Sequence, residues 1–326
     1  MLVAMRKLMS LALQGGGSHG AFTAGVLDRL LEDERILFDG ITGASAGAIN
    51  AVLVAQGLVE GGSAGARAAL QEFWHTLGQS PSAPVETLVA LTRFLAPQQL
   101  NPLNLNPLRK LLSERVDFER LRRASPVRLF VSATDVASGM PRIFGTRELS
   151  LDVVLASACL PSLNQAVQIE GVAYWDGGLT ANPPVRPLIY QCDAADVLVV
   201  LLQPQHAAIP TTADRIWARV NEIGFSSTLH CEIQGLALAK QAAEQRAFAV
   251  GRLERRLRRL NLHAIGPTEP MSTMDGMSRL KTDAAFLRLL VREGRFQAEA
   301  WLEAHFPSVG VRSTMPFGRH LRPAAA

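Results

Sequence analysis

Apolar residues along the chain alternate between short uninterrupted runs and stretches with helical spacing. The apolar run over residues 7–14 and the β-branched run over residues 197–202 are typical of buried parallel strands. After the first run, Phe22, Val26 and Leu30 recur every four residues, which predicts an amphipathic helix. This alternation of strands and helices predicts an α/β fold with a mostly parallel central sheet.

The same patterns predict the remaining elements and the domain organisation. Further strands are expected over residues 36–42, 127–135, 142–144, 172–175 and 261–265, and helices over residues 18–35, 46–59, 151–157, 212–259 and 283–305. Residues 64–125, which contain an apolar segment at 85–95, predict a helical insertion. We expect one large domain over residues 1–265, then a C-terminal helical segment and a disordered tail within residues 266–326.

A glycine run follows the first predicted strand. Gly15, Gly17 and Gly20 satisfy the pattern G-x-G-x-x-G between a strand and a helix. Glycines let backbone N–H groups converge, and the helix N-terminus adds positive potential, so this loop is suited to an anion. The anion is either the pyrophosphate of a dinucleotide or the oxyanion formed in ester cleavage. Asp39 lies near the position where a dinucleotide-binding unit needs an acidic residue, so the run alone leaves both open.

A serine stands at the next predicted strand-to-helix turn, in Gly43-Ala44-Ser45-Ala46-Gly47. The pattern G-x-S-x-G is typical of a nucleophile elbow, where small neighbours are needed because the helix folds back against the strand. Since the elbow follows the glycine run so closely, the pair favours an oxyanion site over a dinucleotide site. The sequence therefore predicts a serine nucleophile for acyl transfer.

Two kinds of proton acceptor are compatible with Ser45. A Ser-Asp-His triad of the α/β-hydrolase order would use Asp176 and then His206, His230 or His263. However, the serine follows only two predicted strands, too early for that fold, and no histidine lies in a glycine- or proline-marked loop that is clearly aimed at a site. Asp176 ends a predicted strand in an Asp-Gly-Gly turn, where a desolvated carboxylate can accept the serine proton directly.

Together these segments resemble the patatin-like phospholipase family. The family's oxyanion motif stands at residues 15–20, its nucleophile motif at residues 43–47 and its Asp-Gly-Gly motif at residues 176–178. Residues 101–112, residues 156–161 and the Asn182-Pro183 pair look like further family blocks. The resemblance covers roughly residues 7–187, with weaker support to residue 265. It implies a three-layer α/β/α fold and hydrolysis of lipid acyl esters by a Ser-Asp dyad without histidine.

The resemblance also assigns roles to single residues. Ser45 is expected to be the nucleophile and Asp176 its base. The expected oxyanion donors are the backbone amides of Gly15, Gly16 and Gly17. The supporting motif positions are Gly20, Gly43, Gly47, Gly177 and Gly178.

The composition indicates which cofactors, partners and cellular compartment to expect. The 326-residue chain is 48% hydrophobic, yet no uncharged apolar run reaches the roughly eighteen residues that indicate a membrane span. Cys159, Cys192 and Cys231 are well separated and no metal-ligand spacing occurs, so we expect no metal, no cofactor and a reducing, cytoplasmic setting. A net charge of +4 gives no indication of nucleic-acid binding.

A basic helical segment within residues 252–259 adds a membrane hypothesis. Its arginines share one face, opposite a leucine stripe: Arg252, Arg255, Arg256 and Arg259. This face is either the solvated side of a packed helix or a docking face for anionic head groups. The sequence thus predicts a phospholipase A or carboxylesterase, cytoplasmic or peripheral on an anionic membrane. The alternatives are a Ser-Asp-His esterase, a dinucleotide-binding oxidoreductase and a non-catalytic lipid-binding regulator.

Overall fold

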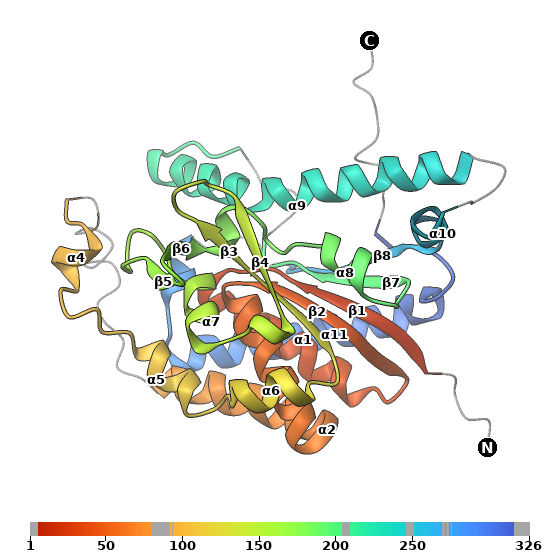
Figure 1. Ribbon diagram of the computed structural model, residues 1–326, viewed down its shortest axis with the longest axis horizontal. Coiled ribbons are helices and arrows are strands. Elements are labelled where there is room, and N and C mark those ends of the chain that lie inside the picture. The colour runs from red at the N-terminus through yellow and green to blue at the C-terminus, as the bar shows by residue number, and fades with distance from the viewer. Residues whose placement is uncertain are drawn as a thin grey trace, which may run out of the picture.

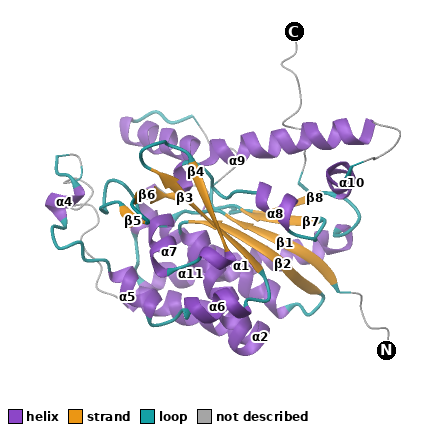
Figure 2. Ribbon diagram, viewed as in Figure 1, coloured by secondary structure: helices purple, strands orange, loops and turns teal. Residues whose placement is uncertain are grey.

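The computed structural model describes residues 6–79, 92, 94–203, 209–245, 251–268, 271, 274 and 276–315. Within these residues a mixed β-sheet is covered by helices on both faces (Figures 1 and 2). The three-layer α/β/α fold predicted from the sequence is confirmed.

Within the described residues, eight strands form one sheet in the order β5-β6-β3-β2-β1-β7-β8, and β4 pairs with β3. Their bounds are β1 (Lys7–Leu13), β2 (Ile36–Ala44), β3 (Arg128–Asp135), β4 (Pro141–Gly145), β5 (Val167–Ile169), β6 (Val172–Asp176), β7 (Asp196–Val200) and β8 (Asn261–Ile265). Strands β3, β2, β1, β7 and β8 are parallel, whereas β4, β5 and β6 form antiparallel pairs. The parallel strands all end at one edge of the sheet, called here the carboxyl edge, and begin at the opposite, amino edge.

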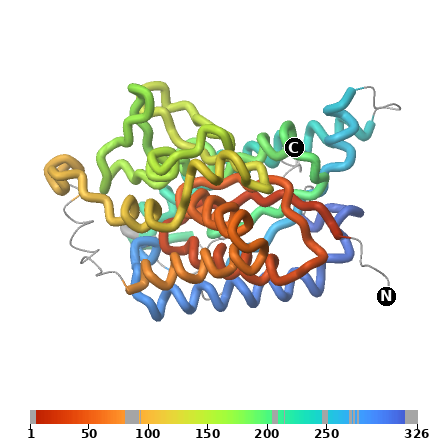
Figure 3. Tube along the Cα trace, turned by 60° about the horizontal axis from the view of Figure 1, so that its bottom comes forward, coloured from red at the N-terminus to blue at the C-terminus, as the bar shows by residue number. Residues whose placement is uncertain are grey.

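The described α-helices are α1 (Gly20–Glu32), α2 (Ala46–Gln79), α4 (Pro97–Leu100), α5 (Pro107–Ser113), α6 (Phe118–Ala124), α7 (Leu151–Ser157), α8 (Arg186–Gln191), α9 (Ala213–Gln245), α10 (Arg252–Arg259) and α11 (Ala284–His305). Helices α1, α2 and α11 cover one face of the sheet, and α8, α9 and α10 lie on the other (Figure 1). Figure 3 shows α11, in blue, running along α1 and α2, so the C-terminal segment packs on the main body.

The central strand β7 shows why its residues are apolar without interruption. Leu198 and Val200 belong to the core beneath α1, α2 and α11, whereas Val197 and Val199 belong to the core beneath α8, α9 and α10. All four are fully buried. A strand covered on both faces cannot alternate apolar with polar positions, because both sets of side chains are buried.

Most predicted elements are present, with boundaries shifted by a few residues. Strand β8 and helix α7 have the predicted bounds. Helix α2 continues past the helix predicted over residues 46–59, through a kink at Gly61 and Gly62, where Gly62 has φ 61°. The helix predicted over residues 212–259 is wrong as one element, because α9 and α10 are separate helices. The short strand β5 was not predicted. The segment predicted over residues 85–95 falls largely outside the described residues.

The structure also bears on membrane spans and on the C-terminal tail. Across the described ranges, no helix has the length and apolarity needed to cross a membrane. At the start of the predicted tail, the N–H groups of Thr314 and Met315 donate to the carbonyl of Leu262 in β8, and Met315 is buried. The remainder of that tail lies outside the described residues.

Candidate active site

The serine of the predicted elbow lies at the carboxyl edge, between the end of β2 and the start of α2. The φ of Ser45 is 52°, in the left-handed region that a non-glycine residue adopts only where its surroundings impose it. Its N–H donates to the Oγ of Ser157 at 2.9 Å, and only 9% of the serine is exposed. Ser45 is therefore held on a strained, tightly packed turn of the kind that presents a nucleophile.

Strand register brings Asp176 to this serine. Strand β2 pairs with β3 up to Ala44, which lies opposite Ser132, and β6 pairs with β3 from Asp176, which lies opposite Ala133. Strand β4 pairs with the other lateral side of β3. Strands β2 and β6 therefore pair with the same side of β3, one after the other, and the ends of β2 and β6 meet there. Ser45 follows Ala44 directly, and the elbow and the Asp-Gly-Gly turn therefore become neighbours although they are far apart in the sequence.

The Asp176 carboxyl is almost completely buried, with 1% of the residue exposed. Burial raises the pKa of Asp176 to about 6, and this rise is partly offset by the Gly178 N–H and the Ser45 hydroxyl, which both favour the charged form. Oδ1 accepts from the Gly178 N–H at 2.7 Å. Within the described part of the chain, Oδ2 makes no hydrogen bond of normal length and angle, so this oxygen is available to accept a proton.

The backbone around Asp176 is fixed on both sides. Its N–H donates to the carbonyl of Cys159 at 2.8 Å, and its carbonyl accepts from the Oγ1 of Thr134 at 2.8 Å. Burial raises the pKa of the Cys159 thiol to about 11, which keeps it protonated and unreactive at neutral pH. The carboxylate is thus the basic group that this loop presents.

The glycines of the predicted motifs are required by close packing. A Cβ on Gly15 would lie 2.9 Å from the Cβ of Ser45, so the glycine run directly contacts the elbow. Gly17 has φ 57°, and a Cβ there would lie 2.3 Å from the carbonyl oxygen of Arg279. A Cβ would also lie within 2.8 Å of a neighbouring atom at each of the supporting positions Gly20, Gly43, Gly47, Gly177 and Gly178.

The three predicted oxyanion donors differ in their hydrogen bonding. The Gly15 N–H donates to the Oδ1 of Asn182 at 2.6 Å, so this amide is already engaged. For the amides of Gly16 and Gly17, no acceptor is found among the described residues. Gly16 and Gly17 are therefore the better candidates for binding an oxyanion.

Sequence reasoning assigned no role to two residues that support the site. Asn182 is fully buried and links three segments, because its Oδ1 accepts from Gly15 and its Nδ2 donates to the carbonyl of Phe225 at 3.1 Å. Ser157, at the end of α7, fixes the elbow through the Ser45 N–H. Each lay in a segment that looked like a family block, Asn182 in the Asn182-Pro183 pair and Ser157 in residues 156–161.

The structure places the histidines in unrelated positions. His263 is buried at β8, where it bonds to Asp196 at 2.9 Å and Thr314 at 2.9 Å, and Asp196 begins β7 at the amino edge. His19, in the glycine run, has its pKa lowered to about 3 by burial and, less strongly, by Arg279, so it is neutral. Of the other histidines considered for a triad, His230 lies in α9 and His206 falls outside the described residues.

The acidic residue considered for a dinucleotide site also lies away from the glycine run. Asp39 is inside β2, five residues before its end, and its Oδ2 accepts from the N–H of Ala194 at 2.8 Å. Ala194 precedes β7, so the carboxylate points to the amino edge and braces a loop there. Among the described residues, no group of three or more acidic, cysteine or histidine side chains is arranged to hold a metal ion.

Comparison with known families identifies the class of the chain. The family model for patatin-like phospholipase matches residues 11–189, which is more than half of the chain. The chain therefore belongs to the patatin-like phospholipase family.

Individual relatives are more distant. The uncharacterized protein YjjU of Escherichia coli (strain K12) is 29% identical over 201 residues, which are 59% of this chain and 51% of that protein. The chain thus spans about half the length of this curated relative. VipD from Legionella pneumophila has a TM-score of 0.41 at 17% identity and covers 92% of this chain and 67% of its own. The ExoU–SpcU complex of Pseudomonas aeruginosa has a TM-score of 0.32 at 16% identity, and the match covers 94% of this chain and 79% of the matched chain. These two structures carry no argument about function.

Proposed function

We propose that the protein is a serine lipid acyl hydrolase of the phospholipase A or carboxylesterase type. The observation that carries the proposal is the meeting of Ser45, on its strained turn, with the buried carboxyl of Asp176, whose Oδ2 is available. Membership of the patatin-like phospholipase family supports a lipid ester as the substrate. The chemistry proposed needs no metal and no cofactor.

The first half of the reaction forms an acyl-enzyme. The Oγ of Ser45 attacks the ester carbonyl carbon while Asp176 accepts the hydroxyl proton, and the carbonyl oxygen becomes an oxyanion held by the amides of Gly16 and Gly17. The tetrahedral intermediate then collapses, the ester C–O bond breaks, and Asp176 returns the proton to the leaving alcohol. Gly15 acts as a positioning residue here, because Asn182 already accepts its N–H.

The second half releases the fatty acid. Water attacks the Ser45 acyl ester and gives its proton to Asp176, which then passes it to the serine oxygen as the acid departs. The pKa of about 6 suits both directions, since a carboxylate of ordinary pKa is a weaker base toward the hydroxyl.

A labelling experiment tests the nucleophile. A fluorophosphonate probe should modify the wild-type chain stoichiometrically and should not modify Ser45→Ala, whereas Ser138→Ala, an exposed turn serine, should label normally. The same preparations should be tested on p-nitrophenyl esters of increasing chain length and on phospholipid vesicles. A dinucleotide-binding oxidoreductase would instead retain NAD(P) and be indifferent to Ser45→Ala, and a lipid-binding regulator would bind vesicles without releasing fatty acid.

The compartment and the membrane contact are part of the same proposal. A cytoplasmic enzyme that meets its lipid at an anionic membrane surface fits the free cysteines and the modest positive charge. In helix α10 the guanidinium of Arg256 donates to the carbonyls of Leu188 and Ala194, whereas the other three arginines of its basic face are exposed. Because this helix lies at the amino edge and Ser45 at the carboxyl edge, α10 is a poor candidate for bringing lipid to the serine. We therefore propose that the lipid is approached from the carboxyl edge.

A further inference from the structure

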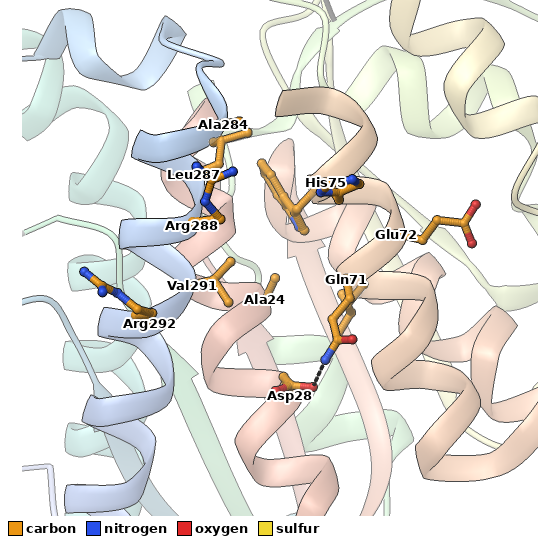
Figure 4. A pocket seen from close by; sticks show the side chains of 12 residues that line it. Ala24, Asp28, Gln71, Glu72, His75, Ala284, Leu287, Arg288, Val291 and Arg292 are labelled. Carbon is orange, nitrogen blue, oxygen red and sulfur yellow. Dashed lines mark hydrogen bonds between the residues drawn. The ribbon is translucent and has the colours of Figure 1, made fainter. Parts of the chain in front are cut away.

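A cavity of about 510 Å³ lies between α1, α2 and α11. Figure 4 shows its walls, with α11 on one side and α1 and the second half of α2 on the other. Its apolar wall is made of Ala24, Leu70, Trp74, Ala284, Leu287 and Val291. The volume is within the range of about 300–1,000 Å³ that small-molecule sites occupy, so the space is large enough for a lipid-sized ligand.

The polar groups at the rim differ in whether they are already paired. Asp28 is engaged by Arg67 and Arg295 and also accepts from Gln71 at 3.1 Å. His75 bonds to Gln79 at 2.8 Å, and Glu72 pairs with Arg115. Every acidic group at the rim therefore has a basic partner.

Two rim cations have no such partner. Arg288 and Arg292 are exposed and lie one turn apart on α11. Within the described ranges, no hydrogen bond or ion pair involves either guanidinium. In Figure 4 Arg288 lies beside the cavity, whereas the guanidinium of Arg292 points to the other side of α11. An apolar cavity with one uncompensated positive charge at its mouth, and a second that reaches it by a change of side-chain rotamer, is complementary to a molecule with a hydrocarbon chain and an anionic head.

We propose that this cavity binds a free fatty acid, with its chain against the apolar wall and its carboxylate paired with Arg288 and Arg292. The site is separate from the hydrolytic site and does not depend on the proposed function, since binding needs no turnover. Its α11 wall lies beyond residues 11–189, so the family assignment does not imply it.

The cavity nevertheless adjoins the glycine run through one side chain. The Nε1 of Trp74 donates to the Oδ1 of Asn50 at 2.9 Å, and the Nδ2 of Asn50 donates to the carbonyl of Gly20 at 2.9 Å. The Trp74 ring also packs on Gly20, where a Cβ would lie 2.9 Å from it. A chain in the cavity would therefore contact the tryptophan that fixes the start of α1.

Tryptophan quenching tests the proposal on the full chain. Dibrominated stearate should quench the fluorescence of the wild-type protein saturably, because bromine quenches an indole only at contact and Trp74 lines the cavity. Trp74→Phe should lose the saturable quenching while calorimetry still detects binding. Affinity for saturated acids should rise by about fourfold for each added methylene until the cavity is full.

Charge variants separate the fatty acid from other amphiphiles. In Arg288→Gln/Arg292→Gln the dissociation constant for the fatty acid should rise by roughly fivefold, and the matched double variant Arg255→Gln/Arg259→Gln on α10 should bind as wild type does. A fatty alcohol or a lysophosphatidylcholine should bind both forms equally and more weakly than the acid binds wild type. Filling the cavity with Ala24→Leu should weaken binding of every chain.

Three results would contradict the proposal that the cavity binds a fatty acid. Equal fatty-acid affinity in wild type and Arg288→Gln/Arg292→Gln removes the carboxylate contact, and undiminished quenching in Trp74→Phe places the ligand at another tryptophan. Tighter binding of the uncharged alcohol than of the acid would identify a different ligand class. Loss of ester hydrolysis in a separate assay leaves all these results untouched, so the two proposals fail independently.

Discussion

Two buried aspartates lie at opposite edges of the same sheet and have opposite surroundings. Asp196, which begins β7 at the amino edge, accepts at one oxygen from Asn261 at 3.2 Å, His263 at 2.9 Å and the Gly310 N–H at 2.8 Å. Asp176, which ends β6 near the carboxyl edge, accepts at Oδ1 from Gly178, whereas its Oδ2 has no hydrogen bond of normal geometry among the described residues.

The difference shows how one fold keeps a structural carboxylate apart from the carboxylate that we propose to be reactive. Donors around Asp196 tie β7, β8 and the turn at Gly310 together, so its charge is compensated by contacts that hold the fold. The energetic cost of burying the Asp176 carboxylate is compensated only in part by hydrogen bonds. The pKa of Asp176 is therefore raised to about 6. An incompletely satisfied buried group costs stability, and such groups are concentrated where chemistry takes place.

The largest expected effect is on catalysis. Asp176→Asn should lower kcat by about 10⁴-fold on p-nitrophenyl esters, because the amide cannot accept the serine proton. Asp196→Asn, which makes the same chemical change at the amino edge, should keep kcat per folded molecule within about threefold. Comparable losses in both variants, measured on protein with native circular dichroism, would show that the two aspartates do not differ in role.

Stability should change with opposite sign in the two variants. A carboxyl whose folded pKa of about 6 exceeds its ordinary value of 3.8 favours folding below pH 3.8, and this contribution is lost as the pH rises through 6. At pH 8 Asp176→Asn should therefore unfold at higher denaturant, with a gain of about 2–3 kcal/mol. Asp196→Asn should lose about 1–3 kcal/mol, because three donors lose a charged acceptor.

Urea unfolding of the three proteins at pH 8 measures both changes. The expected gain for Asp176→Asn should shrink at pH 4, where the wild-type carboxyl is protonated. If Asp176→Asn is instead less stable than wild type at pH 8, the carboxylate is a structural group and the contrast between the two sites is wrong.

Activity should follow the ionisation of Asp176. Since the base must be charged, kcat/KM should fall as pH drops through about 6 and be about tenfold lower at pH 5 than on the plateau. Asp196→Asn should give the same profile. A profile that is flat from pH 5 to 8 in the wild type would argue that another group accepts the proton.

A smaller effect is expected at the residue that holds the glycine run. Asn182→Ala removes the acceptor of the Gly15 N–H and the link to Phe225, so the oxyanion donors lose their fixed position. We expect kcat to fall by about 10- to 100-fold with KM nearly unchanged. Asn182→Asp, which keeps the acceptor oxygen, should recover part of the loss. Equal KM and kcat losses in both variants would indicate a general folding defect.

The smallest effect is expected at α10. Arg252→Gln/Arg255→Gln should change hydrolysis of anionic vesicles by less than about twofold, because α10 packs beside the loop before β7 at the amino edge, far from the elbow (Figure 1). Sedimentation with anionic vesicles gives a second readout. A strong loss of vesicle binding with unchanged hydrolysis of soluble esters would restore α10 as a docking face.

The fold could be predicted from the sequence because it depends on local signals, and the positions of the motif turns depend on local signals as well. Apolar runs identify β7 and β8, and glycines mark the elbow and the Asp-Gly-Gly turn whatever the tertiary structure. Asn182 and Ser157 could not be assigned from the sequence, since their partners lie 167 and 112 residues away. The break between α9 and α10 was missed because no proline marks it, and Gly251, which precedes α10, cannot be told apart in the sequence from Gly224 and Gly235, which lie inside α9.

Because β2 and β6 pair one after the other with the same side of β3, the spacing of the proposed catalytic pair, Ser45 and Asp176, depends on strand register. A slip of β6 by a single residue would move its last side chain by about 3.3 Å along β3 and turn it to the opposite face of the sheet. Substitutions that loosen this three-residue pairing would thus abolish turnover while leaving every reacting group in the protein intact.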